Sequence, residues 1–187
     1  MSYDDEHVNS RESVGVFDIR HTRGAPISMK LASLLTPNQV MLDLKGDTCD
    51  KAIFEIIEHL ISRELLADDM HDEIISLLKE REQQISTGIG SGVAIPHAFS
   101  DNVEKVTACF ARSVGGVDFE ALDNAPVNFI ILFVVPKKDY SLHLQTLAAI
   151  AKMFNNCAVR QELQQAETVA EVLDIFASRP SRTHCEK

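Results

Sequence analysis

The chain has 187 residues and a mass of 20.8 kDa, with 45% hydrophobic and 25% charged residues, so we expect one domain built around a single core. Its net charge of −10 at pH 7 repels polyanions, which argues against a nucleic-acid partner. The longest apolar run, residues 129–135, is too short to span a bilayer, and the acidic N-terminus leads into no apolar stretch typical of a secretory signal. We therefore expect a cytoplasmic protein without membrane insertion.

Both ends of the chain differ in pattern from its centre. Residues 1–28 mix charged residues with Ser, Gly, Asn and His and show no sustained periodicity, and residues 179–187 are similar. We predict a flexible N-terminal extension over 1–28, a folded domain over 29–178 and a flexible C-terminal tail over 179–187.

The first half of the predicted domain reads as a strand followed by two helices. Alternation of apolar with polar or small residues over 40–44 predicts a short strand. Either Asp47 or Thr48 can cap the first helix, because apolar residues then recur at helical spacing over 53–61. The same spacing over 70–81 predicts a second helix, with cationic residues in its last turn.

The second half contains the strongest strand signal. Residues 106–112 have strand character, and the β-branched and aromatic run 127–135 lies between two prolines, as expected of a central strand buried on both faces. Helices are predicted over 142–154 and 159–165, and Thr168 opens a capping box that begins the last helix. Strands and helices that alternate in this way predict a single α/β domain of three layers, a mixed β-sheet flanked by helices on both faces.

A glycine-rich segment precedes a histidine in the middle of the chain. Residues 86–97 read Ser-Thr-Gly-Ile-Gly-Ser-Gly-Val-Ala-Ile-Pro-His. Glycines permit positive φ and leave backbone N–H groups unobstructed, as an anion-binding loop requires. A dinucleotide fingerprint is excluded because Val93 stands where it needs glycine, and a Walker loop is excluded because Gly-Lys-Ser/Thr is absent. The predicted phosphate-binding residues are Ser86, Thr87, Gly88, Gly90 and Gly92.

His97 ends this segment and is the candidate nucleophile. Pro96 restricts the backbone before it, and a neutral imidazole is a competent nucleophile at cellular pH. A zinc site of His97, His143 and Cys109 is the alternative, but the sequence has no paired-ligand spacing, and we predict no metal and no cofactor. The remaining histidines have no comparable surroundings and are predicted to be structural or solvated: His7, His21, His59, His71 and His184.

The segment 86–97 closely resembles the phosphorylation-site signature of the fructose/mannitol and nitrogen-regulatory enzyme IIA family of the bacterial phosphoenolpyruvate-dependent phosphotransferase system. Arg81-Glu82 lies just upstream as in that family. Residues 119–127 resemble the family's segment before the central strand, and His143-Leu-x-x-Leu147 resembles its second-histidine motif. The similarity extends over roughly residues 30–178, while the N-terminal extension has no counterpart.

The resemblance implies specific roles. His97 would be phosphorylated at Nε2 by the histidine-containing phosphocarrier HPr, and Arg81, Ser86 and His143 would line the same pocket. A phosphoryl group in transfer carries charge on three oxygens, so a fixed cation and positioned donors suit it. Ser141 is the predicted N-cap of the helix that carries His143, which would place this histidine in the first helical turn.

Three functions remain open from the sequence. A regulatory phosphocarrier would bind an unknown target according to its phosphorylation state, a transport component would pass the phosphoryl group to a IIB domain, and an interaction module would use a vestigial site. The chain shows no IIB cysteine signature and no permease segment, which favours regulation. The complete set of Arg81, Gly88, Gly90, His97 and His143 argues against a vestigial site.

Overall fold

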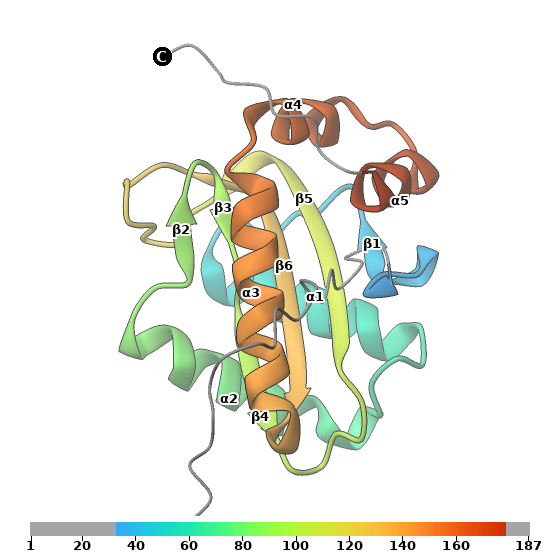
Figure 1. Cartoon of the computed structure of the whole chain (residues 1–187). Coiled ribbons are helices and arrows are strands. Elements are labelled where there is room, and N and C mark those ends of the chain that lie inside the picture. The colour runs from blue at the N-terminus through green and yellow to red at the C-terminus, as the bar shows by residue number, and fades with distance from the viewer. Residues whose placement is uncertain (1–32, 179–187) are drawn as a thin grey trace, which may run out of the picture.

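A mixed sheet of six strands lies between two layers of helices in the computed structural model, which describes residues 33–178 (Figure 1). The predicted extension 1–28 and the predicted tail 179–187 lie outside these described residues. The strands are β1 (Val40–Met41), β2 (Gly88–Gly90), β3 (Val93–Ala94), β4 (His97–Ser100), β5 (Thr107–Val117) and β6 (Val127–Pro136). The helices are α1 (Cys49–Ser62), α2 (His71–Gln84), α3 (Tyr140–Phe154), α4 (Cys157–Gln165) and α5 (Val169–Ala177), with short 3-10 turns η2 (Pro37–Gln39), η3 (Asp68–Met70) and η4 (Lys137–Asp139).

The strand order is β1-β5-β6-β3-β2, and β4 also pairs with β6. β5 runs antiparallel to β6, whereas β3 and β4 run parallel to β6 one after the other. The two strands therefore act as one interrupted strand along the edge of β6. This topology confirms the predicted mixed sheet.

β6 is buried on both faces, as its composition predicts. Ile130, Leu132 and Val134 pack in the core beneath α1 and α2. Phe129 and Ile131 alternate with them and pack in the core beneath α3, α4 and α5. Successive side chains of a strand point to opposite faces, so one strand supports both cores. In Figure 1, α3 crosses the near face of the sheet while α1 and α2 lie behind it.

Most helix boundaries follow the predicted signals. α1 begins directly after Thr48, and α5 begins after the capping box in which Thr168 and Glu171 exchange hydrogen bonds. The prediction of Ser141 as an N-cap is wrong, because η4 runs directly into α3 and the N-cap is Asp139. His143 is nevertheless the fourth residue of α3 and stays in its first turn.

Two other elements differ from expectation. The strand predicted over 40–44 pairs with β5 only at Val40 and Met41, although the N–H of Leu44 still donates to the carbonyl of Arg112 at 3.0 Å. The glycine-rich segment is not an open loop, because it forms the β2–β3 hairpin. No helix within residues 33–178 is long and apolar enough to cross a membrane.

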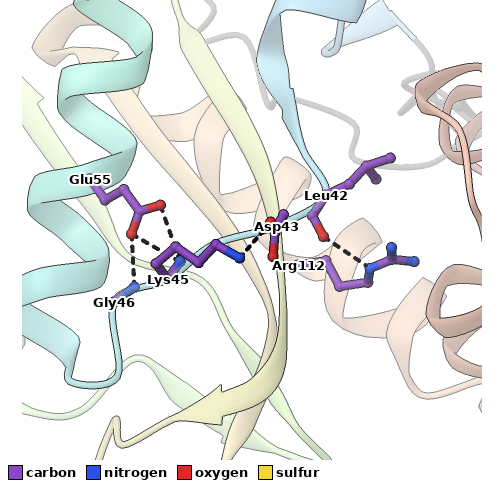
Figure 2. Close-up of polar contacts among 6 residues, drawn as sticks. All are labelled: Leu42, Asp43, Lys45, Gly46, Glu55 and Arg112. Atoms are coloured by element: carbon purple, nitrogen blue, oxygen red, sulfur yellow. Dashed lines mark hydrogen bonds and ion pairs between the residues drawn. The ribbon is translucent and has the colours of Figure 1, made fainter.

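Two polar side chains hold the connection that follows β1 (Figure 2). The carboxylate of Glu55 in α1 accepts the backbone N–H groups of Lys45 and Gly46, the latter at 2.7 Å. The buried guanidinium of Arg112 donates from Nε to the carbonyl of Leu42 at 3.4 Å. Its Nη1 also donates to carbonyls at the end of α4, those of residues 163, 164 and 166, which have no partners within the helix.

Candidate functional site

His97 lies where the interrupted edge strand resumes pairing with β6. Ala94 ends β3, His97 begins β4, and Pro96 between them has no N–H to leave unpaired. The carbonyl of Pro96 accepts the N–H of Phe133 at 2.9 Å, so the backbone just before His97 stays fixed to the central strand. The break therefore interrupts the strand without changing its register along β6.

The backbone also sets the tautomer of His97. Its Nδ1 lies 2.9 Å from the carbonyl oxygen of Ile95, and a carbonyl can only accept, so Nδ1 carries the hydrogen. The lone pair of the neutral ring is then on Nε2. The Nε of Arg81 lies 3.3 Å from this Nε2 and donates to it, which agrees with the same tautomer. The unprotonated nitrogen of His97 therefore faces a permanent cation.

The surroundings keep His97 neutral. Burial is the main cause that lowers the pKa of His97, and the positive charge of Arg81 lowers it further. The hydrogen bond to Ile95 and the negative charge of Glu82 act in the opposite direction. The net effect is a pKa below the usual 6.5 for histidine, which leaves the ring unprotonated at neutral pH.

Arg81 comes from the last turn of α2, where its side chain is oriented by a second contact. Its Nη1 donates to the carbonyl of Ile85, the residue that ends the helix, at 2.9 Å. Ile85 has extended backbone and an exposed side chain. The guanidinium is therefore held between the end of its own helix and the ring of His97.

His143 approaches from α3 in the opposite helical layer. Its ring centroid lies 5.0 Å from that of His97, and its ring packs edge-on against Phe99 and Phe133 at 5.2 and 5.5 Å. Burial, followed by the neighbouring His97, lowers the pKa of His143 to about 4. Its Nε2 is buried without a hydrogen-bond partner among the described residues. A buried polar atom of this kind carries a free-energy penalty of about 1–3 kcal/mol, which a bound polar group would relieve.

The structure does not bring the tip of the glycine segment to His97. Gly90 and Gly92 adopt φ of +88° and +76° to turn the β2–β3 hairpin. Val93 after this turn pairs with Phe129 of β6, whereas His97 pairs with Phe133, four residues further on. In an extended strand that separation is roughly 13 Å. The positive φ of these glycines serves the reverse turn.

The hydroxyl groups of Ser86 and Thr87, just before the hairpin, both form hydrogen bonds within the protein. The hydroxyl of Ser86 donates to the carbonyl of Phe119 at 2.6 Å, and that of Thr87 donates to Glu82 at 2.7 Å. Gly88 leaves no room for a side chain, since a Cβ would lie 2.7 Å from the Cβ of Ala121. These three residues frame the site from beside α2.

Asp123 orients the turn before β6. Its carboxylate accepts the N–H groups of Ser91 at 2.7 Å and Ala125 at 3.2 Å, and these hydrogen bonds lower its pKa. It therefore ties the tip of the hairpin to the loop that leads into β6.

Sequence reasoning missed two components of the site. Phe99 is two residues after His97 in β4, and its ring contacts both histidines as well as Tyr140. The period of two in a strand could have revealed it. The role of the Ile95 carbonyl cannot be predicted from the sequence, because every residue has a backbone carbonyl.

The geometry offers little to a metal ion. Within residues 33–178 no three His, Cys, Asp or Glu side chains gather closely enough to hold one. Cys109 packs in the core beneath α1 and α2, where burial raises its pKa to about 12. His143 packs against Phe99 and Phe133, which belong to the other core, so the zinc alternative has no support.

Comparison with known proteins gives a consistent result. A family model described as phosphoenolpyruvate-dependent sugar phosphotransferase system, EIIA 2, matches residues 33–179. The nitrogen regulatory protein of Pseudomonas aeruginosa is 33% identical over 147 residues, 79% of this chain and 94% of the relative. The fructose-specific EIIA component of Haloferax volcanii is 39% identical over 109 residues, 58% of this chain and 71% of the relative.

A solved structure extends this likeness to three dimensions. The nitrogen regulatory protein IIA-Ntr of Neisseria meningitidis superposes with a TM-score of 0.72 at 29% identity, over 78% of this chain and 98% of that one. The fold, the motif that ends at His97 and the family match agree with one another and confirm the resemblance seen in the sequence. The chain belongs to the EIIA 2 family of the phosphoenolpyruvate-dependent sugar phosphotransferase system.

Proposed function

We propose that this chain is a phosphohistidine carrier that accepts a phosphoryl group from an HPr-type phosphocarrier on Nε2 of His97. The observation that carries the proposal is the hydrogen bond from Nδ1 to the carbonyl of Ile95, which leaves the lone pair on Nε2. In the transfer, an N–P bond forms at this nitrogen while the N–P bond of the donor's phosphohistidine breaks. The electron pair of the broken bond returns to the donor's ring.

Arg81 and His143 are proposed to stabilise the charge that the phosphoryl group brings. The guanidinium of Arg81 already lies against Nε2, so it can move onto the phosphoryl oxygens as the new bond forms. The unpartnered Nε2 of His143 is the second donor, in the tautomer or the cation that carries hydrogen there. Ser86, Thr87, Gly88, Gly90 and Gly92 are proposed to act indirectly, by shaping the loops that hold this pair in place.

Regulation is the role we favour for the carrier. The Pseudomonas relative that matches over nearly its whole length is named a nitrogen regulatory protein. Exposed apolar side chains surround the site, among them Ile85 beside Arg81 and Tyr140 and Leu144 beside His143. A regulatory partner that covers these side chains would sense the phosphorylation state of His97 directly. We propose that the chain performs this role in the cytoplasm.

Transfer to a IIB domain is the second candidate, favoured by the fructose-specific name of the Haloferax relative. It uses the same phosphohistidine and differs only in the acceptor. An interaction module with a vestigial site is not favoured, because a vestigial site has no need of a fixed tautomer facing a positioned cation.

The test is phosphorylation in a purified system. Incubation with phosphoenolpyruvate, enzyme I and HPr should add one phosphoryl group that is labile in acid and stable in alkali, and His97→Ala should abolish it. His59→Ala is the matched control, since the ring of His59 is bonded to the carbonyl of Asn38 and should leave labelling unchanged. Label that persists in His97→Ala contradicts the proposal. Adding a IIB domain then separates the roles, because only a transport component should pass the label on.

A further inference from the structure

A relay of hydrogen bonds connects α2 to the ring of His97 through two backbone carbonyls. Both carboxylate oxygens of Glu82 are engaged by Thr87, one by its N–H and one by its hydroxyl, each at 2.7 Å. The carbonyl of Thr87 accepts the N–H of Ile95 at 3.1 Å. The carbonyl of Ile95 in turn accepts Nδ1–H of His97 at 2.9 Å. These hydrogen bonds therefore connect the carboxylate of Glu82 to Nδ1 of His97, the nitrogen whose hydrogen defines the tautomer.

The middle of the relay is buried, so water cannot replace its hydrogen bonds. Thr87 and Ile95 are only 4% and 5% exposed. Without Glu82, the N–H and hydroxyl of Thr87 would have to find other partners inside the protein, which moves the backbone of Thr87. Ile95 is hydrogen-bonded to that backbone, so its carbonyl would move as well. The acceptor for Nδ1–H would then be displaced.

We propose that Glu82 is a positioning residue for phosphoryl transfer, which holds Thr87 and Ile95 so that His97 keeps its hydrogen on Nδ1 and its lone pair on Nε2. The inference rests on the function proposed above and assigns this residue a part in it. Arg81 and Glu82 are neighbours in α2, so a single helical turn supplies the cation that faces Nε2 and the carboxylate that fixes the opposite nitrogen. The end of α2 thus acts on both nitrogens of one ring.

Two substitutions of Glu82 separate geometry from charge, because the carboxylate also raises the pKa of His97 electrostatically. Glu82→Gln removes the charge, yet its carbonyl oxygen can still accept the N–H of Thr87 while its amide donates to the hydroxyl. Glu82→Ala removes both contacts. If geometry matters, the glutamine variant should resemble the wild type. If charge matters, it should resemble the alanine variant.

The matched control lies at the other end of the sheet. Glu55 in α1 also uses its carboxylate to hold backbone N–H groups of a connecting segment, those of Lys45 and Gly46 (Figure 2). None of its hydrogen bonds within residues 33–178 leads to His97. Glu55→Ala therefore reproduces the loss of a loop-holding carboxylate without touching the relay.

The experiment reads the tautomer directly in unphosphorylated protein by the ¹⁵N chemical shifts of the His97 ring nitrogens at neutral pH. Wild type, Glu82→Gln and Glu55→Ala should show a protonated Nδ1 and an unprotonated Nε2. Glu82→Ala should show a mixture of tautomers and accept phosphoryl from HPr roughly ten- to a hundredfold more slowly, a loss of the size found when a residue that orients a metal-binding histidine is removed. Glu82→Gln should restore the acceptance rate.

A folded Glu82→Ala that keeps the wild-type ¹⁵N pattern overturns the proposal, and so does a glutamine variant that behaves like alanine. If Glu82→Ala does not fold, Thr87→Val decides by the same ¹⁵N criterion, since it removes only the hydroxyl arm of the relay and should show a partial shift between tautomers. The spectra need no phosphoryl donor. A wild type that HPr cannot phosphorylate therefore contradicts the proposed function while leaving the tautomer measurement valid.

Discussion

The two imidazoles of the site differ in what their ring nitrogens contact. His97 has a partner on each nitrogen, the carbonyl of Ile95 on one side and Arg81 on the other. His143 keeps its Nε2 buried without a partner among the described residues, in a setting that lowers its pKa to about 4. In the proposed function, the ring of His97 forms the bond to phosphorus and the ring of His143 interacts with the charge that the phosphoryl group brings.

Phosphorylation of His97 should raise the pKa of His143. Burial and the neighbouring ring now disfavour the imidazolium, whereas a phosphoryl group with about −1.5 to −2 charge favours it. As the pH falls from alkaline values, the phosphorylated protein should therefore protonate His143 well before the unphosphorylated protein does. An NMR titration of both forms measures this difference.

Removal of the His143 ring tests its contribution to the transfer. The His143→Ala variant should accept phosphoryl more slowly but to the same final stoichiometry. Loss of one preorganised donor costs about 3–4 kcal/mol in a buried oxyanion site, and a site open to partners should lose somewhat less. We expect acceptance slower by roughly one to three powers of ten. An unchanged rate, or equal pKa values of His143 in the two forms, would show that this side chain does not contact the phosphoryl group.

At the scale of elements, periodicity and capping predicted the helices and the central strand. β6 and the start of α5 follow their residue patterns because burial on two faces and the reciprocal bonds of a capping box need particular side chains. The β2–β3 hairpin was not predicted, since glycines with positive φ suit an anion loop and a tight turn equally well. Only the register along β6, in which Val93 pairs with Phe129 and His97 with Phe133, shows that the glycine turn lies away from His97.

Three side chains that meet at the site were predicted, whereas that of Phe99 was not. His97, Arg81 and His143 were named from the sequence, and the structure brings them together. The carbonyl of Ile95 and the relay from Glu82 could not be named, because backbone groups have no residue signature and their direction depends on the fold.

Arg112 is expected to stabilise the fold without affecting the site. Its Nη1 donates to the carbonyls of Leu163 and Ala166 at the end of α4, at 2.8 and 2.6 Å. Arg112→Met keeps much of the volume but leaves buried carbonyls unpaired, so the free energy of unfolding should fall by about 2–4 kcal/mol. Urea denaturation measures the change, with the exposed Arg63→Met as the control. The variant should still accept phosphoryl at the wild-type rate, and a slower rate would connect this end of the sheet to the site.

At the scale of the whole molecule, an acidic chain exposes apolar side chains beside the proposed phosphorylation site. The chain carries a net charge of −10, and Tyr140 and Leu144 expose apolar side chains next to His143. The proposed phosphorylation of His97 would add negative charge beside these side chains. A partner held by apolar contacts would have to desolvate that charge, which weakens its binding.

Targets of the regulatory form should therefore prefer the unphosphorylated protein. Pull-downs from cell extract with wild type and His97→Asp should recover different partners, because the aspartate places a negative charge near the phosphoryl position. His97→Ala is the control that removes the ring without adding charge, and it should retain the wild-type partners. Identical partner lists for all three proteins would argue against a phosphorylation switch.

The break between β3 and β4 affects how rigidly the ring of His97 is oriented. The two successive carbonyls within the break accept different hydrogen bonds, that of Ile95 from the ring of His97 and that of Pro96 from the N–H of Phe133. Phe133 is completely buried, so the peptide next to His97 is hydrogen-bonded to the core of the molecule. The orientation of Nε2, the proposed phosphoryl acceptor, therefore depends on a peptide that is hydrogen-bonded to the buried central strand.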